Sequence, residues 1–137
     1  MSKALVLYIQ VAAPTGTRFG HPFSLSADEA DTFGFDNHSD ATMFSYARRL
    51  VTEASGTFVY IEASNPKENL GIVRSFMSFL VEKKPAGRVL LSGHHPMLDR
   101  MATAAGAERV SDATEANSVL AEWLTGYSDK EKGSASR

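Results

Sequence analysis

Cysteine is absent from this chain of 137 residues, which excludes disulfide bonds, thiolate catalysis and thiolate metal ligands and favours a reducing compartment. A basic excess is also lacking, because the net charge is −2. Nucleic-acid binding requires such an excess, so we expect no nucleic-acid partner. The first residues, MSKALVLYIQV, hold an apolar run too short to span a membrane and no signal-peptidase site. We therefore expect a cytoplasmic protein without a membrane partner.

What the chain does contain is the composition of an ordinary globular domain, with 43% hydrophobic and 22% charged residues. Four short runs rich in apolar and branched residues predict strands, at 4–11, 57–64, 88–92 and 107–110. The first run is almost continuously apolar, which is typical of a strand covered on both faces. The polar end, SDKEKGSASR, predicts a disordered tail at 128–137, so we place a single domain at 1–127.

Helical patterns separate these runs. The first covers 41–55, and the others open at Asn65, Pro96 and Asp112. Asn65 and Asp112 are each followed three residues later by a glutamate, so both are expected to cap a helix through a capping box. The alternation of strand and helix predicts one doubly wound α/β domain, with a mostly parallel four-stranded sheet and helices on both faces. Because crossovers are right-handed, few topologies remain, and we expect a flavodoxin-like strand order of 2-1-3-4 first.

One segment does not fit this alternation. Residues 12–40 connect the first strand to the first helix and are far longer than the usual connection in such units. The segment is either a lid or binding loop, or a covering loop that hides a small hairpin around HPFSLS and TFGF. The sequence leaves these alternatives open.

Ligands of open parallel sheets gather beyond the carboxyl ends of the strands, where helix N-termini also point. The stretch LLSGHHPML places two histidines at such an end, with Gly93 for the turn and Pro96 to start the helix. The simpler interpretation is that His94 or His95 ends the strand and helps to cap the helix. The catalytic interpretation is a hydrolase or group transferase, in which His94 or His95 is the general acid or base and Glu62 orients it.

Two features limit the chemistry of this histidine pair. The nearest serines, Ser64 and Ser92, do not lie in a Gly-x-Ser-x-Gly nucleophile elbow. A metal site would need the pair to join His21 or His38 and a carboxylate, and the metal-binding pattern His-Glu-x-x-His is missing. We therefore predict no metal site and name no cofactor, and whether the chain is an enzyme stays open.

An anion site is indicated by the stretch APTGTRFG, which follows the first strand. Thr15, Thr17 and the N–H group of Gly16 would cradle an anion, and Arg18 would neutralise its charge. Flavodoxin-like proteins hold a phosphate at this position. Here no helix is predicted directly after the stretch, so no family is assigned.

We rank first a small binding or regulatory domain for an anionic, phosphate-bearing ligand, which lies at the strand ends under the segment 12–40. The residues expected to contact it are Thr15, Gly16, Thr17, Arg18, His21, Ser64, Asn65, Ser92, Gly93, His94 and His95. The alternatives are the hydrolase or transferase and a protein–protein interaction module without a small-molecule site. Homodimerisation would cover the edge strands of so small a sheet and is also open.

Overall fold

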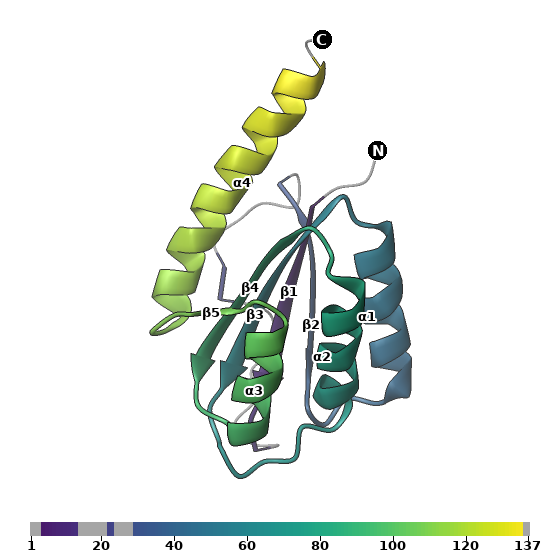
Figure 1. Ribbon diagram of the computed structural model, residues 1–137, viewed down its shortest axis with the longest axis vertical. Coiled ribbons are helices and arrows are strands. Elements are labelled where there is room, and N and C mark those ends of the chain that lie inside the picture. Colours follow the sequence, from purple (N-terminus) through teal and green to yellow (C-terminus); the bar gives the residue numbers. More distant parts are fainter. Residues whose placement is uncertain (1–3, 14–21, 24–28, 136–137) are drawn as a thin grey trace.

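The computed structural model describes residues 4–13, 22–23 and 29–135, with the backbone alone for 127–135. Its elements follow one another as β1 (Ala4–Val11), β2 (Asp31–Asp36), α1 (Ala41–Glu53), β3 (Gly56–Ala63), α2 (Ile72–Lys83), β4 (Gly87–Gly93), α3 (Pro96–Ala104), β5 (Glu108–Arg109) and α4 (Ala113–Ala135). The described strands form one sheet in the order β2-β1-β3-β4-β5, and every neighbouring pair is parallel (Figure 1). The expected doubly wound, flavodoxin-like α/β fold is confirmed.

The sheet has one strand more than the sequence predicts, and this strand lies within the connection 12–40. β2, which contains TFGF, pairs with β1 in parallel and takes the outer place beside β1 at one edge of the sheet. Most of HPFSLS, the other half of the expected hairpin, lies outside the described residues, so the hairpin stays a prediction. The run 57–64, which was expected in that place, forms β3 on the other side of β1. Apolar runs could not reveal β2, because it is an edge strand in which Phe35 alone is buried.

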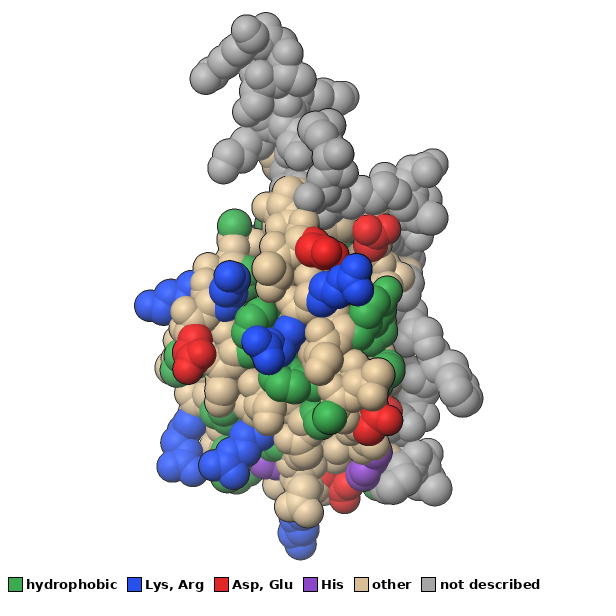
Figure 2. All heavy atoms as spheres, turned by 90° about the vertical axis from the view of Figure 1, so that its right-hand side faces the viewer, with side chains coloured by type: hydrophobic (Ala, Val, Ile, Leu, Met, Phe, Trp, Pro, Cys, Tyr) green, Lys and Arg blue, Asp and Glu red, His purple; other side chains and the backbone are tan. Residues whose placement is uncertain are grey.

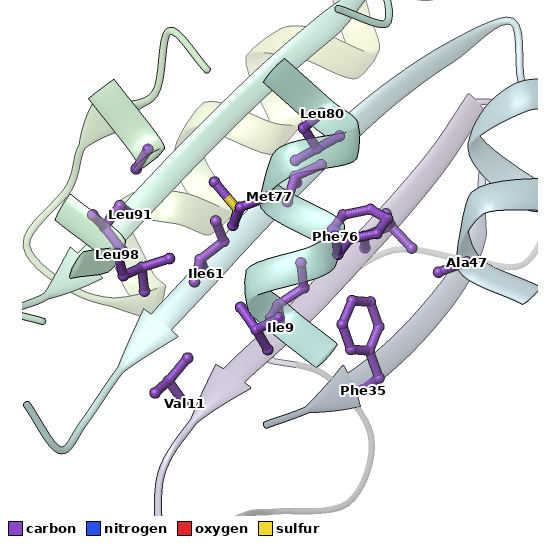
Figure 3. Close-up of a cluster of buried hydrophobic side chains, with 14 of the residues drawn as sticks. Ile9, Val11, Phe35, Ala47, Ile61, Phe76, Met77, Leu80, Leu91 and Leu98 are labelled. Atoms are coloured by element: carbon purple, nitrogen blue, oxygen red, sulfur yellow. The ribbon is translucent and has the colours of Figure 1, made fainter. Parts of the chain in front are cut away.

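The sheet separates two apolar layers, because successive side chains of a strand point to opposite faces. Ile9 of β1 belongs to the layer beneath α1, α2 and α3, and Tyr8 belongs to the layer beneath α4. Figure 3 shows the first layer, where Phe76 of α2 meets Phe35 of β2 edge to face. Helices therefore cover both faces, and burial on both sides explains the continuous apolar run of β1.

Three of the expected helices begin where the sequence predicts. Asp40 caps α1 with its side chain, and α3 begins at Pro96. At the start of α4, the carboxylate of Asp112 accepts a hydrogen bond from the N–H group of Glu115 at 3.0 Å. Signals in the local sequence were sufficient at these three places: the helical pattern for α1, Pro96 for α3 and the capping box for α4.

The second helix begins at Ile72 and not at Asn65, which corrects the capping box expected there. Asn65 Oδ1 accepts a hydrogen bond from the N–H group of Lys67 at 2.9 Å, so the residue forms a local turn. Gly71 then precedes the helix with a φ of 56°, and a Cβ at this position would collide with the carbonyl oxygen of Asn37. An Asn-Pro pair suits a turn as well as a helix start, so packing of the loop decides between them.

The last helix, α4, continues to Ala135 and so includes most of the polar segment 128–137. Figure 1 shows it extending past the end of the sheet. The boundary between domain and tail at residue 127 stays a prediction. Within the described residues, no helix is both long enough and apolar enough to cross a membrane.

Candidate functional site

The carboxyl edge of the sheet contains the topological switch point of the fold. β2 lies on one side of β1, whereas β3, β4 and β5 follow on the other side, so the strand order reverses between β1 and β3. Gln10 of β1, Glu62 of β3 and Ser92 of β4 lie side by side in register at this edge. Gln10 and Ser92 are buried and Glu62 is half-buried. A row of largely buried polar side chains therefore crosses the switch point.

Two tyrosines join this row on the α4 side of the sheet. The Tyr8 hydroxyl donates to Glu62 Oε1 at 2.8 Å, and the Tyr60 hydroxyl donates to Glu62 Oε2 at 3.3 Å. The Tyr60 hydroxyl also lies 2.7 Å from Ser92 Oγ, and the two tyrosine rings stack with centroids 5.7 Å apart. Because Tyr8 and Tyr60 are partners in register and Glu62 follows two residues after Tyr60, strand geometry brings these groups together. We name Tyr8, Tyr60, Glu62 and Ser92 the tyrosine–glutamate cluster.

Tyr60 keeps its proton in this cluster. Burial raises the pKa of Tyr60 from 10.0 to about 12, and the negative charges of Glu62 and Asp112 act in the same direction. The hydrogen bond with Ser92 lowers the pKa, but by less than burial raises it. At neutral pH Tyr60 is therefore a hydrogen-bond donor and not a base, and the carboxylate of Glu62 is the acceptor.

The histidine pair stands at the start of α3. His95 is buried, its Nδ1 accepts a hydrogen bond from the N–H group of Leu98 at 3.3 Å, and its Nε2 lies 2.7 Å from the carbonyl oxygen of Glu68. A neutral imidazole with its proton on Nε2 satisfies both contacts. His94 is exposed, and its Nδ1 lies 3.9 Å from Asp99 Oδ2. For His95, the geometry matches the simpler interpretation, because the side chain caps α3 and ties it to the loop before α2.

Among the described residues, Glu62 does not orient either histidine. Its carboxylate bonds to tyrosine hydroxyls on the α4 face, whereas α3, which His95 caps, packs on the opposite face. Alternation along β3 is the physical reason, since Ile61 and Ala63 point towards α3 and Glu62 points away from it. The expected pairing of Glu62 with His94 or His95 is corrected accordingly.

The other expected contact residues have structural partners or lie outside the described residues. The N–H group of Ser64 donates to the carbonyl oxygen of Val11 at 3.0 Å, and Asn65 forms the turn before α2. Gly93 adopts a φ of 81° at the end of β4, where a Cβ would collide with the carbonyl oxygen of Ala63. The predicted contacts that lie outside the described residues are Thr15, Gly16, Thr17, Arg18 and His21.

His38, which was weighed as a metal ligand, ties loops together. Its Nε2 lies 2.7 Å from the carbonyl oxygen of Ala12 and 3.4 Å from Glu68 Oε1. The neighbouring Asn37 does the same with its amide, which accepts from the N–H group of Ala12 and donates to the carbonyl oxygen of Asn69. In the described part of the chain, no three histidine, aspartate or glutamate side chains converge as a metal site requires.

Sequence reasoning missed the two tyrosines of the cluster. Tyr8 and Tyr60 stand inside apolar runs, and the pattern of these runs predicts only buried strands. A usable signal was present, because a tyrosine buried in a sheet covered on both faces needs a partner for its hydroxyl. For Tyr60, a nearby acceptor on the same face of the strand is Glu62, two residues later in the sequence.

Comparisons of the chain with protein-family models, with curated proteins and with solved structures found no match. No activity is carried over from another protein. The function is therefore inferred from the carboxyl edge itself.

Proposed function

We propose that the chain is a small ligand-binding domain and that its ligand carries both hydroxyl groups and a phosphate. The ligand lies beyond the carboxyl ends of β1 and β3, with its hydroxyl groups on Glu62 and its phosphate on the segment after β1. The position of Glu62 carries the proposal. It is a half-buried carboxylate at the switch point, held by the hydroxyls of Tyr8 and Tyr60.

A carboxylate in this position suits a hydroxyl-bearing ligand. An ionised carboxylate accepts hydrogen bonds and does not donate them, so its partner on the ligand has to be a donor. In nucleotide-binding doubly wound folds, an acidic side chain commonly binds ribose hydroxyls. The two tyrosines hold Glu62 in place before any ligand arrives, which reduces the entropy lost on binding.

The phosphate part of the proposal rests on the sequence after β1. Residues 15–18, Thr-Gly-Thr-Arg, offer hydroxyl and N–H donors together with a positive charge. The chain returns to the described part at Pro22 and Phe23, and the Phe23 ring centroid lies 6.2 Å from that of Tyr8 and 5.9 Å from that of Tyr60. The connection that contains the anion-binding residues thus returns beside the tyrosine–glutamate cluster.

The geometry favours binding over the alternative of a hydrolase or group transferase. Tyr60 retains its proton, and both ring nitrogens of His95 have backbone partners, so neither side chain is placed to act as a base. His94 is the exposed imidazole of the predicted catalytic pair, and Asp99 is its neighbour. An enzyme that depends on His94 stays a prediction.

The alternative of a protein–protein module gains no specific support from the surface. Figure 2 shows one face of the molecule, on which hydrophobic side chains lie in small groups between charged ones. Among the described residues, the large hydrophobic side chains that are exposed belong to Tyr46 and Met97. Homodimerisation through an outer strand and the cytoplasmic location stay predictions.

Calorimetric titration with ribose 5-phosphate, ribose and inorganic phosphate tests the proposal, because the three probes separate hydroxyl recognition from phosphate recognition. We expect ribose 5-phosphate to bind more tightly than either fragment. Glu62→Gln removes one charged hydrogen bond worth ~1.5–3 kcal/mol, so it should weaken both sugars by about 10- to 100-fold. The same variant should leave inorganic phosphate unchanged, whereas Arg18→Ala should weaken both phosphate-bearing probes.

Glu68→Gln is the matched control for this experiment. It makes the same substitution at the same edge of the sheet, in the loop before α2, where the carboxylate pairs with His38. All three titrations should be unaffected by it, and circular dichroism should show that each variant is folded. The proposal fails if no probe binds, or if the two substitutions weaken ribose equally.

A further inference from the structure

A cavity lies at the opposite, amino edge of the sheet. It has a volume of about 320 Å³ and sits where β3 and β4 begin and where α2 and α3 end. Its apolar walls include Val59, Leu80, Val89 and Ala105. Small-molecule sites in proteins measure roughly 300–1,000 Å³, so the cavity has the size of a site for a small ligand.

Thr57, one of the residues that line this cavity, also carries a polar group without a partner among the described residues. It lines the cavity, is 3% exposed and points to the same face of β3 as Val59. Among the described residues, its Oγ1 is buried and has no hydrogen-bond partner. Buried hydroxyl groups are nearly always hydrogen-bonded, because burial without a partner costs free energy. A partner from outside the chain would remove this cost.

The charges at the rim of the cavity largely cancel. Arg88 and Glu108 form a two-point ion pair, with nitrogen–oxygen distances of 2.6 and 2.9 Å to the same carboxylate oxygen, so each neutralises the other. Lys84 caps the end of α2, beside the carbonyl ends of α2 and α3, which carry partial negative charge. A charged ligand, whether positive or negative, therefore gains little binding free energy at this rim. A neutral ligand gives up no favourable electrostatic interaction there.

We propose that this cavity binds a neutral amphiphile, an alcohol with a short hydrocarbon body. The ligand hydroxyl bonds to Thr57 Oγ1, which both donates and accepts, and the hydrocarbon lies against Val59, Leu80 and Val89. Two favourable terms then act together, because the threonine hydroxyl gains a partner and the ligand buries apolar surface. This site is independent of the function proposed for the carboxyl edge.

A titration followed by amide NMR spectra tests the site with three probes of equal length: hexan-1-ol, hexanoate and hexylammonium. We expect hexan-1-ol to bind at least about tenfold more tightly than either ion, because the neutral rim does not repay the free-energy cost of removing a charge from water. The largest shifts should occur at the amides of Thr57, Arg88 and Ala105. Equal affinity for the three probes, no binding at all, or shifts centred elsewhere would overturn the proposal.

Three variants separate the contribution of the Thr57 hydroxyl to binding from the contribution of the volume of the cavity. Thr57→Val replaces the hydroxyl with a methyl group and should weaken hexan-1-ol by about five- to tenfold. Because it removes an unpartnered polar atom, this variant should remain folded. Thr57→Ser keeps the hydroxyl and should retain the preference for the alcohol, and Ala105→Leu should fill the cavity and abolish binding of every probe. The proposal would be wrong if Thr57→Val bound hexan-1-ol as tightly as the wild type does.

Discussion

The two edges of the sheet treat their buried polar side chains in opposite ways. At the carboxyl edge, Tyr8, Tyr60, Glu62 and Ser92 bind one another, and the ring nitrogens of His95 bind backbone groups. At the amino edge, a threonine that lines a cavity has a buried hydroxyl without a partner among the described residues. Among the described residues, these side chains of the carboxyl edge have hydrogen-bond partners within the chain, whereas the amino edge leaves one hydroxyl group without a partner.

A polar residue at a strand end is therefore not in itself the mark of a ligand site. His95 stands where ligands of parallel sheets gather, yet its imidazole serves the start of a helix. Thr57 stands at the start of an apolar run, and no pattern in the sequence marks it as a candidate site residue. The two residues differ because the described part of the chain satisfies the hydrogen bonds of His95 and leaves the hydroxyl of Thr57 without a partner, at a cost in free energy.

The largest expected effect concerns the carboxyl edge at high pH. Because the pKa of Tyr60 is raised from 10.0 to about 12, folding favours its protonated form. The associated stability is fully present below pH 10 and is lost as the pH rises to 12, by about 2–3 kcal/mol. Urea unfolding between pH 8 and pH 12 should show this loss in the wild type and not in Tyr60→Phe. Equal losses in the two proteins would mean that the edge does not hold the proton on Tyr60.

A smaller effect separates the two adjacent histidines. His95→Ala should lower the free energy of unfolding by about 1–2 kcal/mol, because it removes the cap of α3 and the contact with Glu68. His94→Ala is the matched control at the exposed neighbour and should change it by less than about 0.5 kcal/mol. Denaturant unfolding at pH 7 measures both values. If His94→Ala were the more damaging change, the capping role of His95 would be wrong.

The smallest expected effect is an increase in the free energy of unfolding, and it concerns the amino edge. Without ligand, Thr57→Val should raise the free energy of unfolding by about 0.5–1 kcal/mol, because it replaces an unpartnered hydroxyl with a methyl group. Thr57→Ser keeps the hydroxyl and should give no such gain. Thermal unfolding of the three proteins decides the question. A loss of stability in Thr57→Val would show that the hydroxyl of Thr57 already has a hydrogen-bond partner. The buried polar side chains of both edges would then be hydrogen-bonded.

The parts of the fold that the sequence predicts are those with strong local signals. β1 is buried on both faces, so its sequence is an almost unbroken apolar run. Pro96 suits the first position of a helix, and α3 begins there. β2 has no such signal, because an outer strand buries few of its side chains. The start of α2 was misplaced because a turn at Asn65 and a helix at Asn65 have the same local sequence. The contact of Gly71 with Asn37, which is distant in the sequence, selects the turn.

The candidate site also has a part that local sequence predicts and a part that depends on tertiary contacts. Local sequence patterns are enough to establish the alternation of strands and helices, and with it the edge at which Glu62, Ser92 and the histidines stand. The tertiary structure alone decided their partners: Glu62 bonds to Tyr8, from another strand, and not to the histidines that follow the neighbouring strand. The physical reason is the pleat of the sheet, which sends successive side chains to opposite faces, so that hydrogen-bond partners come from adjacent strands. The same pleat points Thr57 towards the end of α2, which only packing of the helix brings there.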